Sequence, residues 1–126
     1  MSLFYKKIQR SNPLNRAIVK WYPVLKSIGI LKTKELAKLM SDETTMNPKE
    51  TEMAIYELVK ILKRELKEGK TVSIDDFGTF ILTASTTGEE TEEAVSAGNI
   101  SGLNLRFRPN ADFKTEISKA EVKTWK

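Results

Sequence analysis

The spacing of apolar positions changes along the chain, and each spacing predicts a different element. Between residues 47 and 69 the apolar residues recur every three or four positions, which is the period of a helix. Asn47 is a good N-cap, Pro48 suits the first helical position and Glu50 completes a capping box. Gly69 then supplies a left-handed stop. We predict a long helix with a broad apolar stripe formed by Ala54, Ile55, Leu58, Val59, Ile61, Leu62 and Leu66.

Two shorter segments also have helical spacing. Thr33 is an acceptable N-cap, and the apolar residues after it predict a short helix that ends near Asp42. Residues 112–123 are expected to close the chain as a helix with Phe113, Ile117 and Ala120 facing inward. The long helix has apolar residues on more than one side, so we expect it to pack against both the short helix and a second copy of the chain.

Strand-like patterns flank the helices. Extended segments are expected at about residues 3–10, 17–22, 71–74, 78–85 and 100–108. Asn12-Pro13 and Pro23 are expected to end the first two of these strands. The sequence therefore predicts an α+β chain with two strands ahead of the helices and three strands behind them.

Composition limits the possible functions. The 126 residues can bury only a modest core, which favours a dimer, and they include no cysteine and no histidine. Disulfides, thiolate and imidazole chemistry, and most zinc or copper sites are thereby excluded. Asp75 and Asp76 are adjacent carboxylates that we interpret as turn residues. We expect no enzymatic activity, no metal or cofactor, and no small-molecule substrate.

No apolar run is long enough to span a membrane, and the N-terminus has no export signal, so we expect a cytoplasmic protein that does not contact membranes. The net charge of +4 is distributed unevenly. Residues 1–34 carry eight Lys or Arg side chains and no acid, and residues 106–126 are also basic. Residues 81–105 contain four glutamates and no base. Clustered positive charge at the two ends suggests an anionic partner.

The most informative motif joins two segments. The stretch from Gly69 to Phe80 reads as a helix stop, a strand, a tight turn and a second strand, and Phe107-Arg108-Pro109 reads as a returning strand that ends at proline. Together with the preceding helices, these residues resemble the HU/integration host factor family of bacterial DNA-bending proteins. The resemblance implies an intertwined homodimer whose helical body carries a three-stranded antiparallel sheet and a β-ribbon arm. It places Phe77, Phe80 and Phe107 in the dimer core.

The same resemblance suggests an organisation for the chain. Residues 31–126 would be the HU-like DNA-binding domain, with an arm at about residues 84–102. Residues 1–30 would be an N-terminal extension similar to that of divergent Bacteroides-type HU-like proteins, in which segments similar to Asn12-Pro13 and Trp21-Tyr22-Pro23 precede the HU core. This extension could bind nucleic acid, or it could be a strand pair docked on the body.

The arm departs from the family pattern. HU and integration host factor grip the minor groove with basic arms and insert apolar wedges between base steps, whereas residues 81–105 here contain no Lys, Arg or Pro. The acidic arm is interpreted either as a solvated loop or as a surface that binds a partner or mimics DNA. DNA contacts are therefore expected from Arg106, Arg108, Lys70, Lys114, Lys119, Lys6, Lys7 and Arg10.

Each of these cations also has an ordinary interpretation. Arg106 and Arg108 flank Phe107, so strand alternation places both on the face opposite the buried one, where they could contact phosphates or simply be solvated. Lysines near a helix C-terminus are also expected from the helix dipole. We predict a histone-like, nucleoid-associated protein that binds duplex DNA through phosphates with little sequence preference. The alternative is an HU-fold protein-interaction module that has lost most DNA binding.

Overall fold

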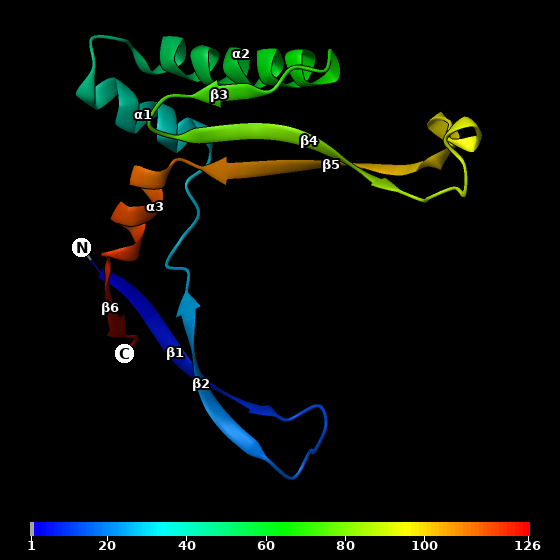
Figure 1. Cartoon of the computed structure of the whole chain (residues 1–126). Helices are drawn as coiled ribbons and strands as arrows, with labels where there is room; N and C mark the ends of the chain where they lie inside the picture. Colours follow the sequence, from blue (N-terminus) through cyan, green and yellow to red (C-terminus); the bar gives the residue numbers. More distant parts are fainter. Residues whose placement is uncertain (1) are drawn as a thin grey trace. The chain divides into compact units, whose positions relative to one another are not determined.

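The computed structural model describes residues 2–126, so Met1, the first residue of the expected extension, lies outside the described residues. These residues form three α-helices and two three-stranded sheets (Figure 1). Contacts divide the chain into a central unit, Thr33–Thr115, and a terminal unit formed by Met1–Lys32 with Glu116–Lys126. The terminal unit thus combines the two ends of the chain. The predicted division at residue 30 stays a prediction.

Two antiparallel helices begin the central unit, α1 (Thr33–Glu43) and α2 (Pro48–Lys67) (Figure 1). Asn47 caps the start of α2 as predicted, because its side chain accepts a hydrogen bond from the backbone N–H of Glu50 at 2.9 Å. The Glu50 side chain accepts no return bond from the Asn47 N–H in the described residues, so only this half of the predicted capping box forms. At its end Gly69 adopts a φ of +89°, and its N–H donates to the carbonyl of Leu66 at 3.1 Å. Glycine tolerates this left-handed conformation because it has no Cβ.

The central sheet is an antiparallel meander with the order β3-β4-β5, formed by β3 (Val72–Ile74), β4 (Gly78–Thr86) and β5 (Ile100–Pro109). These strands confirm the three predicted after the long helix. Asp75 and Asp76 lie in the β3–β4 turn, where Asp76 has a φ of +63° and the N–H of Phe77 donates to the carbonyl of Ile74 at 3.1 Å. Strands β4 and β5 continue beyond β3 as a two-stranded ribbon (Figure 1).

The acidic tip of the ribbon has regular local structure, although its glutamates are exposed as in a solvated loop. It contains two short 3₁₀ turns, η1 (Glu92–Ala94) and η2 (Ala97–Asn99). Asn99 is buried, and its amide donates to the Glu89 carboxylate at 2.9 Å and to the Thr87 hydroxyl at 3.2 Å. Its side-chain oxygen accepts the backbone N–H of Ser96 at 2.9 Å. One amide side chain therefore ties both sides of the tip together.

The terminal unit is a sheet with the order β2-β1-β6, formed by β1 (Ser2–Ser11), β2 (Val19–Lys26) and β6 (Glu121–Thr124). Strand β2 corrects the prediction that Pro23 ends this segment, since Pro23 pairs with Lys7 in mid-strand. Proline is tolerated there because β2 is an edge strand whose outer N–H groups need no partner.

The C-terminal prediction was also wrong in part. Helix α3 covers only Ala111–Ser118, and the chain then forms β6, which pairs in parallel with β1. Ile117 is 60% exposed, and Ala120 is exposed as well, so neither faces inward as expected. Parallel pairing with the other end of the chain replaces the last helical turns.

Few apolar side chains are buried. Among the described residues only Ala37 and Leu66 are buried apolar side chains. Large apolar residues on the helices and on the ribbon remain at least 37% exposed, among them Leu39, Met53, Tyr56, Leu58, Ile61, Leu103 and Leu105. A single copy therefore leaves a large apolar surface in contact with water, as expected for a chain of this length.

Candidate nucleic-acid interface

The register of the β4–β5 ribbon separates its side chains into two faces. Phe80 lies opposite Phe107, while Arg106 lies opposite Ile81 and Arg108 opposite Thr79. Directly opposed residues in an antiparallel pair share a face, and successive residues alternate between faces. One face is therefore apolar, with Phe80, Leu82, Ala84, Leu103, Leu105 and Phe107, and the other carries the two arginines.

The base of the apolar face holds an aromatic cluster. The rings of Phe77 and Phe80 each lie 5.0 Å from the ring of Phe107, centroid to centroid. The ring of Phe113, from α3, stacks on Phe77 at 5.8 Å. The structure thus brings together the three phenylalanines expected in a dimer core and adds a fourth. Phe77 and Phe107 are each 39% exposed, so the cluster is incompletely covered in one copy.

The arginine face is polar and contains no acidic residue. Its members are Ser73, Thr79, Ile81, Thr83, Ser85, Gly102, Asn104, Arg106 and Arg108. The Thr79 hydroxyl donates to the Ser73 hydroxyl at 3.2 Å, and the Asn104 amide donates to the Ser85 hydroxyl at 3.0 Å. Within residues 2–126 neither Arg106 nor Arg108 forms an ion pair, and both are exposed. We take this arginine face as the candidate interface.

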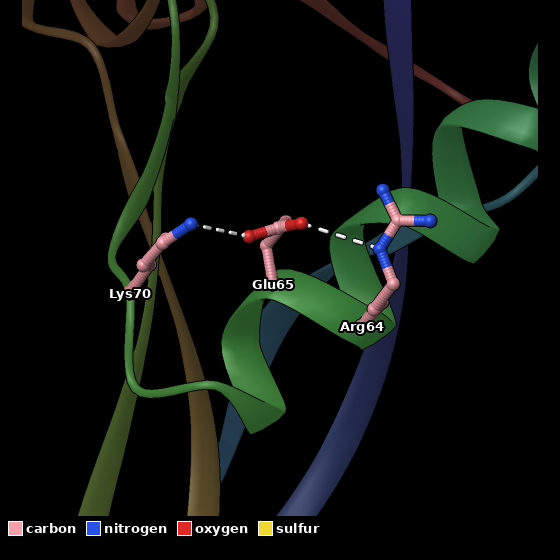
Figure 2. A network of polar contacts seen from close by, with 3 residues as sticks. All are labelled: Arg64, Glu65 and Lys70. Atoms are coloured by element: carbon pink, nitrogen blue, oxygen red, sulfur yellow. Dashed lines mark hydrogen bonds and ion pairs between the residues drawn. The ribbon is translucent and has the colours of Figure 1, made fainter.

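Lys70 is less available than the arginines. Its ammonium donates to the Glu65 carboxylate at 2.9 Å, and the same carboxylate accepts Nε of Arg64 at 3.2 Å (Figure 2). These hydrogen bonds, the one from Lys70 first, hold the pKa of Glu65 below its ordinary value. The pair is exposed and therefore weak. Even so, a phosphate would have to compete with Glu65 for this lysine.

The remaining predicted cations belong to both units of the chain. Lys114 belongs to the central unit and Lys119 to the terminal unit. On β1, Lys6 and Arg10 share one face of the sheet while Lys7 lies on the other. Lys7 there lines a hollow of about 610 Å³ together with Tyr5, Trp21 and Leu25. The predicted cations therefore divide between the two units and, within the terminal sheet, between its two faces. Their role in DNA binding stays a prediction.

Acidic side chains do not gather into a metal site in the part of the chain that the structure describes. Within residues 2–126 no group of three or more Asp or Glu side chains could hold a metal ion. None of the helices that the structure describes is long and apolar enough to cross a membrane. The four arm glutamates, Glu89, Glu90, Glu92 and Glu93, are exposed.

Comparison with known proteins finds one matching family model and a similar solved structure. The model of the HU-HIG family, described as an HU domain fused to a wHTH, Ig or glycine-rich motif, matches residues 1–124. A solved structure from Bacteroides vulgatus, provisionally described as a bacterial DNA binding protein, is similar with a TM-score of 0.66 at 10% sequence identity. The match covers 98% of this chain but 48% of that one, so this chain spans about half its length. At this identity the similarity shows the fold alone. No curated protein matches the sequence significantly.

Proposed function

The chain belongs to the HU-HIG family, and we propose from this that it binds duplex DNA, mainly through phosphates and with little sequence preference. It would act as a histone-like, nucleoid-associated protein of the bacterial cytoplasm that helps to condense DNA, and not as an enzyme. The description of the similar Bacteroides vulgatus protein supports DNA as the partner.

One observation carries this proposal. Arg106 and Arg108 lie side by side on a sheet face that has no acidic residue, and neither is engaged in an ion pair within the described residues. Arginine forms paired hydrogen bonds with phosphate, and the hydroxyl and amide groups around it can donate further ones. Contacts to phosphates position a protein on DNA without reading its sequence.

We further propose that the chain acts as a homodimer. The aromatic cluster and the apolar residues of α2 are too exposed in one copy, and a second copy would cover them. A dimer would also present two arginine faces, and twice as many phosphate contacts would double the electrostatic contribution to the binding free energy.

An interaction module is the second candidate, and the ordered arm tip favours it. Asn99 and the two 3₁₀ turns hold four exposed glutamates on a defined scaffold, which suits recognition of a basic partner better than a disordered loop would. In this interpretation the chain has lost most of its DNA binding, and the arm binds the partner protein.

Replacing Arg106 and Arg108 with alanine together tests the main proposal. Binding to random duplex DNA should weaken about equally for all sequences, and the salt dependence should flatten by about one unit per lost phosphate contact. A salt-titrated fluorescence anisotropy measurement gives both quantities. The control variant, Lys38→Ala with Lys49→Ala, removes the same charge from the two helices. Equal weakening by the control, or unchanged binding by the arginine variant, would contradict the assignment.

The arm glutamates should not contact DNA. Changing Glu89, Glu90, Glu92 and Glu93 to glutamine is expected to leave duplex affinity unchanged or to tighten it, because negative charge is repelled from a groove lined by phosphates. The same duplex titration measures this effect. A glutamine at position 89 keeps an oxygen that can accept the Asn99 amide. A folded variant that loses affinity would show that the arm makes favourable contacts. No DNA binding by the wild-type protein, even at low salt, would favour the interaction module.

A further inference from the structure

The terminal sheet has its own basic face, separate from the arginine face of the ribbon. Alternation along β1 places Phe4, Lys6, Ile8 and Arg10 on the same side of this sheet. Their pairing partners on β2 are Lys26, Val24, Tyr22 and Lys20, and Lys123 of β6 pairs with Phe4. We call these nine residues the basic face. The opposite face carries Tyr5, Lys7, Trp21, Pro23, Leu25 and Val122.

The basic face has a strong positive charge. It contains five cations, Lys6, Arg10, Lys20, Lys26 and Lys123, and none of them forms an ion pair within the described residues. Among the described residues of the three strands, Glu121, the first residue of β6, is the one acidic residue that pairing places on the same side. Residues 2–32 of this unit contain no acid at all. Five unpaired cations against one carboxylate leave this side of the sheet positively charged, so it attracts anions.

Exposed aromatic rings lie among these cations. Tyr22 and Trp125 are each 43% exposed. The Arg10 guanidinium lies 6.0 Å from the centre of the Tyr22 ring, and Nζ of Lys26 lies 4.9 Å from the centre of the Trp125 ring. Trp125 also contacts the Phe4 ring edge to face at 5.3 Å, which fixes it at this end of the sheet.

Each ring lines a hollow that also contains two cations. One hollow, of about 520 Å³, is lined by Tyr22 with Arg10 and Lys20. The other, of about 500 Å³, is lined by Trp125 with Lys123 and Lys126. The two hollows lie at opposite ends of the sheet, because Arg10 and Phe4 are six residues apart on β1, a distance of about 20 Å at the rise of an extended strand. A hollow lined by one aromatic ring and two cations thus occurs twice along one surface.

We propose that the basic face binds single-stranded nucleic acid, with bases stacked on Tyr22 and Trp125 and phosphates on the neighbouring cations. Single strands expose base faces that stack on aromatic side chains, and a positively charged sheet follows their backbone. In a duplex the bases already stack on one another, so these two rings would have no partner. The exposed rings therefore favour a single strand over a duplex. This inference does not rest on the proposed duplex binding, which uses another face.

The test compares single strands and duplexes on the full-length protein. The probes are a fluorescein-labelled oligo-dT strand and a mixed-sequence duplex of equal nucleotide number. Replacing Tyr22 and Trp125 with leucine should lower oligo-dT affinity about 5- to 150-fold for each base stack lost. Duplex affinity should not change. The matched control is Trp21→Leu, because Trp21 is 65% exposed and lies on the opposite face, so it should alter neither affinity.

A second pair of variants separates this site from the arginine face. Arg10→Ala with Lys20→Ala should flatten the salt dependence of oligo-dT binding without loss of the sheet, which circular dichroism checks. The variant that replaces Arg106 and Arg108 with alanine should keep its affinity for oligo-dT and lose affinity for the duplex. Duplex binding by the arginine face and single-strand binding by the basic face can therefore fail independently. The inference is overturned if the wild-type protein fails to bind oligo-dT at low salt, or if the leucine variant weakens both probes equally. Displacement of oligo-dT by poly-glutamate at equal charge concentration would also overturn it, since that outcome indicates a surface for any polyanion.

Discussion

Replacing Phe80 with alanine is expected to lower the free energy of unfolding by about 3–5 kcal/mol, the usual loss when a buried aromatic ring leaves a cavity. The Phe80 ring contacts both Phe107, at 5.0 Å, and Phe77, at 6.2 Å, so its removal opens the centre of the aromatic cluster. The full loss requires that a second copy buries the cluster, because neighbouring rings are 39% exposed in one chain. Denaturant unfolding followed by circular dichroism measures the change.

Protein concentration distinguishes a dimer from a monomer in this experiment. If folding and association are coupled, the unfolding midpoint of both wild type and variant should rise with concentration, and the variant should dissociate more readily. Phe80→Leu is the matched control, because it retains much of the apolar volume and should cost less than alanine. A folded wild-type monomer at micromolar concentration in sedimentation would contradict the proposed homodimer. An alanine variant with unchanged stability would contradict a buried aromatic cluster.

Elements whose signals are local were predicted well from the sequence. The start and end of α2 depend on Asn47 and Gly69, which act on backbone groups within a few residues, and the structure shows both acting as expected. The three strands of the central sheet are bounded by turn residues next to them, including Asp76. Signals of this kind can be read without knowing what else the chain contacts.

The incorrect predictions concern pairing between distant residues. Residues 121–124 become strand β6 because they pair with β1, more than 100 residues earlier in the sequence. Nothing in the sequence next to them indicates this pairing. Pro23 reads as a strand terminator until the strand order shows that β2 is at the edge. Asn99 resembles any other polar residue of the arm, although its amide organises the tip. Tertiary context decided each of these cases.

The candidate site was predicted in part. Alternation around Phe107 correctly placed Arg106 and Arg108 together on the face opposite the aromatic cluster. The sequence analysis grouped Lys7 with Lys6 and Arg10 as DNA contacts, although Lys7 lies on the other face of the sheet. The face that a strand residue occupies affects its contacts only when the strand is part of a sheet, and that sheet was not predicted. The pairing of Lys70 with Glu65 was also missed, because Lys70 lies beyond the end of α2, where helical spacing no longer tells which side chains meet.

The Phe77-Gly78-Thr79-Phe80 motif has a steric explanation in the structure. Gly78 is buried at the start of β4, opposite Pro109. A Cβ at this position would lie 2.5 Å from the backbone oxygen of Arg108 and 2.6 Å from the Phe107 ring. Both distances are shorter than van der Waals contact, and neither a paired strand nor a packed ring moves freely. Glycine is therefore required at the start of β4, where the end of β5 approaches closely.

Gly78→Ala is expected to destabilise the protein by about 3 kcal/mol, the upper part of the range for overpacking, because the added methyl group must push β5 away from β4. The displaced residues include Phe107, in the aromatic cluster, and Arg108, on the arginine face, so duplex affinity should fall together with stability. Gly102→Ala is the matched control, since Gly102 lies on the same ribbon, a Cβ there would have no atom within 4 Å, and the methyl group should be tolerated. Denaturant unfolding and duplex titration of both variants give the two quantities. Equal stability of the two alanine variants would show that the approach of β5 to Gly78 does not constrain the fold.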